Sequence, residues 1–134
     1  MTMASIFDIA GSAMNAQMLR LNTTASNMAN VDTVSGSEAT AYRARQTVFE
    51  TVMSQAAGGP VAVPQIVESQ APVMKRYEPG HPRADGDGYV YGSNVSAVEE
   101  MANMISASRN YQSNAEVFNT TKSLMLRTLQ LGQQ

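Results

Sequence analysis

Residues 21–33 read LNTTASNMANVDT, and this stretch decides how the chain is built. It lies within an apolar repeat of helical spacing, yet Asn, Ser and Thr, which are poor formers of helix interiors, occupy many of its positions. Neutral amides and hydroxyls are buried at far lower cost than charges when each donor and acceptor finds a partner. We therefore expect a helix that contacts similar helices on several sides.

Two segments, at about residues 5–31 and 94–131, carry the alternating spacing of four and three that is typical of paired helices. The first repeat comprises Phe7, Gly11, Met14, Met18, Leu21, Ala25 and Met28. The second comprises Ala97, Met101, Met104, Ser108, Tyr111, Ala115, Phe118, Lys122, Met125 and Leu129. At a rise of about 1.5 Å per residue, such helices are too long for the interior of so small a domain. They should project from it and pair antiparallel.

The segment between the helices has a different character, because it holds all five prolines and most of the glycines. Short β-like runs lie at residues 42–52, 61–67 and 89–91, separated by turn signals. The sequence therefore predicts an α+β fold in three parts. These are an N-terminal helix at 1–31, a small irregular β-rich module with long loops at 32–93, and a C-terminal helix at 94–134.

Composition bounds the function. The chain of 134 residues has a formal charge of -2, which does not favour binding to nucleic acid or to an anionic membrane. Leu, Ile, Val and Phe supply only 25 residues, under the roughly 20 % below which a core is difficult to build. Cysteine is absent, no apolar run is long enough to span a membrane, and no cleavable signal pattern precedes the first helix. Alone, the chain should be weakly folded.

The sequence offers little chemistry. His81 is the only histidine and stands in a turn-rich stretch, without the partners of a catalytic or zinc site. The DGDGYV motif at residues 85–90 lacks the remaining ligands of a calcium loop and is better explained as a turn before a strand. We expect no enzyme, no cofactor, no metal and no small-molecule substrate.

The surfaces of the two helices point instead to assembly. Between residues 5 and 31 the only charges are Asp8 and Arg20, whereas a solvated helix normally carries many. The interpretation is a surface packed against other copies. The predicted subunit or coiled-coil interface comprises Phe7, Met14, Met18, Leu21, Asn22, Ala25, Asn27, Met28, Met101, Met104, Asn110, Tyr111, Asn114, Ala115, Phe118, Met125 and Leu129.

Residues 5–36, SIFDIAGSAMNAQMLRLNTTASNMANVDTVSG, resemble the N-terminal signature of the bacterial flagellar axial proteins. Residues 100–132, EMANMISASRNYQSNAEVFNTTKSLMLRTLQLG, resemble the C-terminal one. Within the family, the motifs FDIAGSA, YRARQ, ESQAP, YEPGHPRAD and GYV are similar to those of proximal-rod subunits of the basal body. Ala41 and Ser93 depart from the pattern, because proline is expected at both positions.

The resemblance implies a structural subunit that is exported without signal cleavage by the flagellar type III apparatus and polymerises in the periplasm into a helical tube. The terminal helices would form the inner layer and the β module the outer layer. Implied partners are other copies, neighbouring rod subunits, the basal rod adaptor and membrane ring, and the peptidoglycan ring. The tube would transmit torque and line the export channel. Two alternatives stay open: a type III needle or inner-rod component, and a soluble coiled-coil scaffold or export chaperone.

Overall fold

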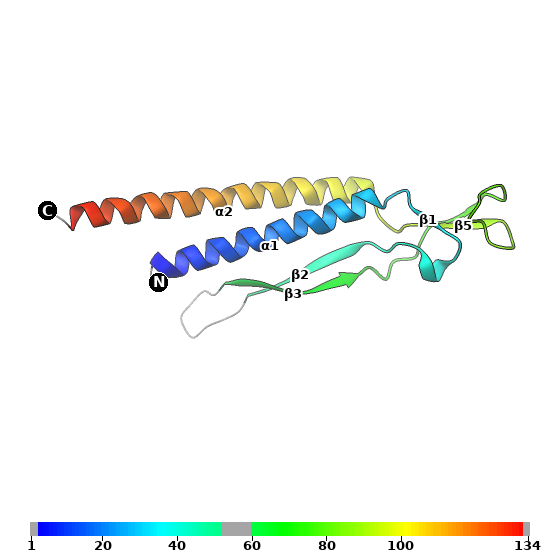
Figure 1. Ribbon diagram of the computed structural model, residues 1–134, viewed down its shortest axis with the longest axis horizontal. Coiled ribbons are helices and arrows are strands. Elements are labelled where there is room, and N and C mark those ends of the chain that lie inside the picture. Colours follow the sequence, from blue (N-terminus) through cyan, green and yellow to red (C-terminus); the bar gives the residue numbers. More distant parts are fainter. Residues whose placement is uncertain (1–2, 52–59, 133–134) are drawn as a thin grey trace.

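The computed structural model describes residues 3–51 and 60–132, which form an elongated molecule with two long helices along most of its length (Figure 1). The helices are α1 (Met3–Ala29) and α2 (Ala97–Leu131), with a short 3-10 helix η1 (Glu38–Thr40) in the middle segment. The strands are β1 (Val34–Ser35), β2 (Arg45–Thr51), β3 (Val61–Glu68), β4 (Lys75–Tyr77) and β5 (Tyr89–Gly92). This arrangement confirms the predicted α+β class with helices at both ends of the chain.

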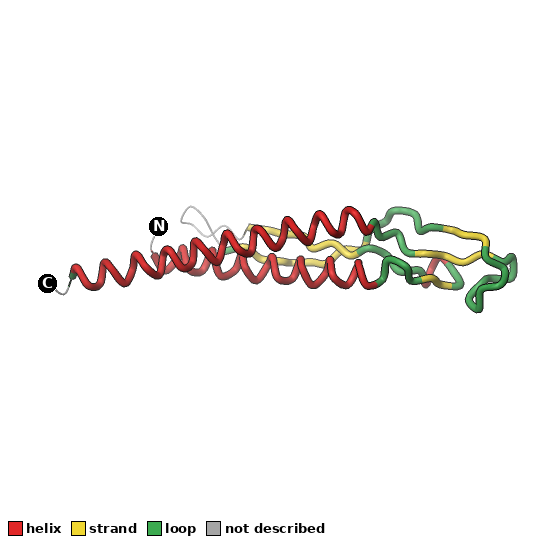
Figure 2. Tube along the Cα trace, turned by 90° about the horizontal axis from the view of Figure 1, so that it is seen from above, coloured by secondary structure: helices red, strands yellow, loops and turns green. Residues whose placement is uncertain are grey.

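Helix α1 lies in the middle of the long body, with antiparallel α2 on one side and the β2–β3 hairpin on the other (Figures 1 and 2). Phe7 and Phe118 meet edge to face with ring centroids 4.8 Å apart, and the Arg20 guanidinium donates to Asn103 Oδ1 at 2.9 Å. On the hairpin side, Ser12 Oγ accepts a hydrogen bond from the Val61 amide at 2.9 Å. Because α1 has two neighbours, few of its positions face water.

The contact between α1 and α2 follows one of the two predicted heptad rows. Its second row lies one residue earlier in the chain than the repeat predicted. Positions 7, 14, 21 and 28 of α1 and 104, 111 and 118 of α2 are half-buried, as the repeat predicts. The second row is Ala10, Gln17, Thr24 on α1 and Glu100, Ala107, Asn114, Thr121 on α2. The sequence repeat placed it one residue later, where Met18 and Met101 are 47 % and 56 % exposed. Small side chains such as Ala10 and Ala107 allow closer approach of the helices than methionine does, so the contact line follows them.

The middle segment divides into two parts. The hairpin β2–β3 is antiparallel and runs along α1, whereas β1, β5 and β4 form a separate antiparallel sheet, in that order, at the far end (Figure 1). The three β-like runs of the sequence became β2, β3 and β5. Strands β1 and β4 were not predicted, because two and three residues are too short to carry a periodic signal.

The tip of the distal sheet depends on Gly88, whose φ of 82° lies in the left-handed region. A Cβ added there would lie 2.9 Å from Tyr77 Cε2 and 3.1 Å from Pro79 Cβ, while one added at Gly86 meets nothing within 4 Å. We expect Gly88→Ala to destabilise the tip by about 1–2 kcal/mol from the backbone conformation alone. Amide exchange at Glu78, whose N–H donates to the Gly88 carbonyl at 2.9 Å, should accelerate. Equal protection in Gly88→Ala and the matched control Gly86→Ala would contradict this.

Candidate assembly surfaces

The residues that were considered for chemistry serve local structure. His81 Nδ1 accepts a hydrogen bond from the Arg83 amide at 3.1 Å. In the loop of the DGDGYV motif, Asp85 Oδ1 accepts from the amides of Asp87 and Tyr89 at 3.0 and 2.8 Å. No group of three or more His, Cys, Asp or Glu residues within 3–51 and 60–132 is placed to hold a metal ion. The carboxylate therefore acts as a turn cap, which agrees with the sequence interpretation of this motif as a turn.

The stability of the loop that contains Asp85 should depend on pH. The pKa of Asp85 is held below its ordinary value, chiefly because the carboxylate accepts the Tyr89 amide, with further help from Asp87, the Tyr91 hydroxyl and the Lys75 cation and against the opposing effect of desolvation. Folding thus favours the ionised form. The contribution of Asp85 to stability should be complete above the ordinary carboxyl pKa and be lost as the pH falls through the lowered folded-state value.

Side-chain NMR of Asp85 in the folded chain measures this directly. The titration midpoint should lie below that of a free aspartate, and protection of the Tyr89 amide should fall only as the pH drops below the ordinary carboxyl pKa. Asp85→Asn is the control, since its tip should lose this pH dependence. A midpoint at or above the ordinary value would show that the amide contacts do not hold the charge.

A junction of side-chain amides joins the adjacent ends of the two helices to the base of the β2–β3 hairpin. The Asn27 side chain donates to the Arg45 carbonyl at 2.8 Å and accepts from the Arg45 amide at 2.9 Å, so it pairs with both main-chain groups of one residue. Its Oδ1 also accepts from the Tyr42 hydroxyl at 3.1 Å. Asn27 is only 1 % exposed. A contact within the chain therefore explains one asparagine of the stretch 21–33, namely Asn27.

Asn94, just before α2, makes the matching contact on the neighbouring residue. Its Oδ1 accepts from the Ala44 amide at 2.6 Å, and its Nδ2 donates to the carbonyls of Ala71 at 2.9 Å and Ser69 at 3.4 Å. Nearby, Ser93 Oγ donates to the Val31 carbonyl at 2.7 Å. We call Asn27, Tyr42, Ser93 and Asn94 the neck. Periodicity missed it; the signal that could have found Tyr42 was the motif YRARQ at residues 42–46.

Helix α2 continues beyond the start of α1. The pairing of Phe7 with Phe118 fixes the register, so the turns of α2 after about residue 121 have no counterpart on α1 (Figure 1). This overhang, residues 122–131, exposes Leu124, Met125, Leu126, Leu129 and Leu131. Met125 continues the row of α2 at positions 104, 111 and 118 that faces α1. The overhang therefore presents a helix-pairing position without a partner in the chain.

The other predicted interface residues lie mostly on open surface. Asn22, Ala25 and Asn110 are exposed, and Asn114 and Ala115 are half-buried. Val98, Met101 and Ile105 form an exposed apolar stripe on the N-terminal half of α2, of which the heptad repeat predicted only Met101. None of the helices within the described residues is long and apolar enough to cross a membrane.

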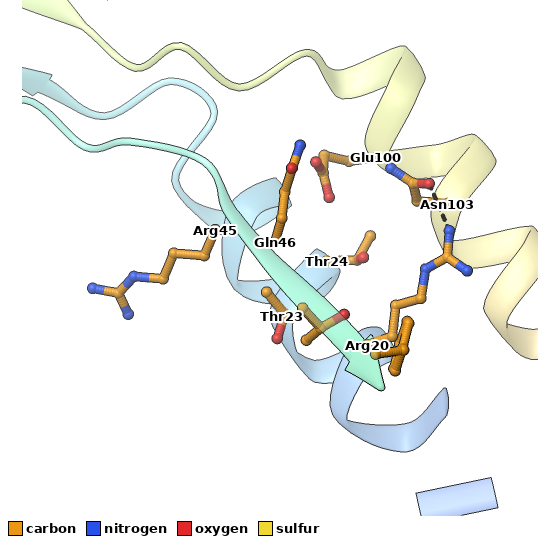
Figure 3. A pocket seen from close by; sticks show the side chains of 9 residues that line it. Arg20, Thr23, Thr24, Arg45, Gln46, Glu100 and Asn103 are labelled. Atoms are coloured by element: carbon orange, nitrogen blue, oxygen red, sulfur yellow. Dashed lines mark hydrogen bonds between the residues drawn. The ribbon is translucent and has the colours of Figure 1, made fainter. Parts of the chain in front are cut away.

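A groove lies where α1, β2 and α2 meet, with a volume of about 340 Å³ (Figure 3). Its lining is polar except for Phe49 of β2 and comprises Arg20, Thr23, Thr24, Arg45, Gln46, Thr47, Phe49, Glu100 and Asn103. Sequence periodicity does not predict this groove, because residues from three distant segments form it.

Comparison with known proteins finds a family match near each end of the chain. Residues 7–36 match the family model described as flagella basal body rod protein, and residues 87–131 match that of the flagellar basal body rod FlgEFG protein C-terminal region. The flagellar basal-body rod protein FlgC of Salmonella typhimurium is 56 % identical, over 99 % of this chain and all of that relative. The proteins of the same name from Escherichia coli O157:H7 and Buchnera aphidicola subsp. Acyrthosiphon pisum are 55 % and 40 % identical, with the same coverage.

These matches favour neither a needle component nor an export chaperone. They cover the helices, the hairpin, the neck and the distal sheet alike. The chain therefore belongs to the FlgC family of flagellar basal-body rod proteins, the structural subunits of the rod in the basal body.

Proposed function

We propose that the chain is a subunit of the proximal rod that polymerises in the periplasm into a helical tube. In this tube α1 and α2 form the inner layer around the export channel, and the tube transmits torque. The subunit reaches the periplasm through the type III apparatus without signal cleavage. The predicted partners are other copies, neighbouring rod subunits, the basal rod adaptor and membrane ring, the peptidoglycan ring and the export apparatus.

One observation supports polymerisation above the others: the overhang of α2 exposes five large apolar side chains (Leu124, Met125, Leu126, Leu129 and Leu131). An isolated helical end of this kind is marginal in water, because most helical stability in proteins comes from packing of the apolar face. A cluster of large exposed apolar side chains is typical of a protein contact. A neighbouring subunit that covers the overhang buries these side chains and thereby stabilises the end of the helix.

A reconstruction of isolated basal bodies tests the proposal. Density for this chain should lie in the proximal rod, with both helices next to the channel and the distal sheet outside. Placement of the chain outside the axial structure, or with the helices away from the channel, would overturn it.

The free subunit should be disordered at the overhang of α2, because residues 122–131 have no partner within the chain. Hydrogen exchange on a verified monomer measures this as rapid exchange at residues 122–131. Residues 14–28 offer an internal reference, since α1 packs between α2 and the hairpin and its Asn27 side chain holds the Arg45 amide. Strong protection of residues 122–131 in the monomer would show that the overhang needs no neighbour.

A further inference from the structure

Glu100 is the single charged residue that is buried within 3–51 and 60–132, with 7 % of its surface exposed. Its carboxylate forms no hydrogen bond or ion pair with any described residue. An acidic residue in the first turn of a helix is favoured by the helix dipole, but Glu99 already provides a charge there while remaining exposed. The dipole therefore does not explain why Glu100 is buried.

The groove supplies the setting of this carboxylate (Figure 3). Glu100 reaches from α2 toward Gln46 of β2 and Thr24 of α1, while the Arg20 guanidinium is directed to Asn103 and the Arg45 side chain points away. Arg45 lies instead 3.6 Å from Glu68 and over the Tyr42 ring. Both arginines of the lining are thus engaged elsewhere, and the Glu100 carboxylate faces the open groove without a counter-charge.

The cations of the chain show the complementary pattern. Six of the nine basic residues are engaged inside the subunit: Arg20, Arg43, Arg45, Lys75, Arg76 and Arg83. The remaining three, Arg109, Lys122 and Arg127, form no ion pair or hydrogen bond with described residues, and all three are exposed on α2. An unpaired carboxylate in a groove and three exposed cations without anions thus occur on the same helix, and Arg109 and Arg127 share one face of it.

We propose that the groove is a socket for a cationic side chain from α2 of a second copy, with Glu100 as its anion. The inference rests on the proposed polymerisation. Charge-assisted hydrogen bonds are short and strong, and a charge pair across an interface fixes the register and the choice of partner. In the proposed contact each copy gives its cation to one neighbour and receives in its groove the cation of another, which is a head-to-tail contact that propagates as an open assembly.

The helical rise gives the displacement between the two copies. Reaching Glu100 from position 109, 122 or 127 requires a shift along α2 of about 14, 33 or 40 Å. The three candidates therefore predict different geometries, which cross-linking separates.

The chain has no cysteine, so pairs of introduced cysteines report these contacts without background. Three double variants combine Gln46→Cys, next to Glu100 in the groove, with Asn110→Cys, Ser123→Cys or Thr128→Cys, each beside one of the three cations, so that every charge of the proposed pairs is kept. In flagellated cells that lack the native chain, one pair should give a ladder of cross-linked copies under mild oxidation. A ladder requires head-to-tail contact, since a reciprocal contact closes as a dimer. Absence of any ladder in assembled rods would overturn the assignment to a second copy.

Glu100→Gln tests the charge itself, because it keeps the shape of the side chain. Incorporation into isolated basal bodies should fall at least tenfold, with intracellular level and helix content unchanged. Glu99→Gln, on the same turn but exposed, is the matched control and should incorporate normally. Reversing the charges of both Glu100 and the cation beside the cross-linked cysteine should restore incorporation that either single reversal abolishes. Normal incorporation of Glu100→Gln would overturn the socket while leaving polymerisation intact, whereas wild-type chain that enters no rod would overturn the proposed function.

Discussion

A chain truncated after Lys122 is expected to be made and exported at near-normal levels but to leave the cell unable to swim. The deletion removes five exposed apolar residues of the overhang: Leu124, Met125, Leu126, Leu129 and Leu131. It spares the pairing of α1 with α2, which ends near Phe118 and Thr121. Each large apolar side chain that a neighbour buries is worth about 1.5–3 kcal/mol, so losing all five should abolish assembly.

Swimming in soft agar and the amount of the chain in purified basal bodies measure the effect. Truncation after Gly132 is the control, because it keeps the whole of α2. Wild-type swimming by cells that contain only the stable chain truncated after Lys122 would show that the overhang is not an assembly surface.

Charge introduced on the asparagines of the helices should separate two kinds of position. Asn22 and Asn110 are exposed in the single subunit, so Asn→Glu at either should change its stability by no more than about 0.5 kcal/mol. If neighbouring copies cover these positions, the same charge is buried without a partner in every repeat of the tube, at a cost of several kcal/mol. We therefore expect normal subunit levels and loss of rod assembly.

Asn27→Glu should behave differently. The Asn27 amide makes three hydrogen bonds, to Tyr42 and to both main-chain groups of Arg45, in a buried site. A glutamate would lose the donor and bury a charge, so the subunit itself should be destabilised by several kcal/mol and be degraded. Immunoblots of whole cells and purified basal bodies distinguish the two classes. Equal levels of all three variants, with normal swimming, would show that Asn22 and Asn110 face water and that the neck tolerates the loss of Asn27.

The hydrophobic periodicity of the sequence predicted part of the contact between the two long helices. Phe7 and Phe118, 111 positions apart, belong to the two predicted repeats and meet in the structure. The row that contains Met18 and Met101 was displaced by one residue, because a hydrophobic repeat weights methionine above alanine whereas close helix packing favours the smaller side chain.

Sequence periodicity could not predict the neck or the groove, for a different reason. Asn94 contacts Ala44, 50 positions earlier in the chain, and Glu100 shares the groove with Arg20 and Thr47. Sequence spacing contains no information about these juxtapositions, because they depend on where the hairpin returns along α1. The resemblance of the terminal segments identified the family, but it did not indicate which asparagines face the interior.

The neck also limits which substitutions evolution can accept in this part of the molecule. Asn27 and Asn94 recognise main-chain groups of Arg45 and Ala44, and not their side chains. At the exposed position 45, most amino acids offer the same amide and carbonyl, so mutation there is nearly neutral with respect to this contact. Proline is the exception at either position, because it has no N–H to donate. Selection at the neck should thus act on the two asparagines and exclude proline at positions 44 and 45, while the residue at position 45 drifts.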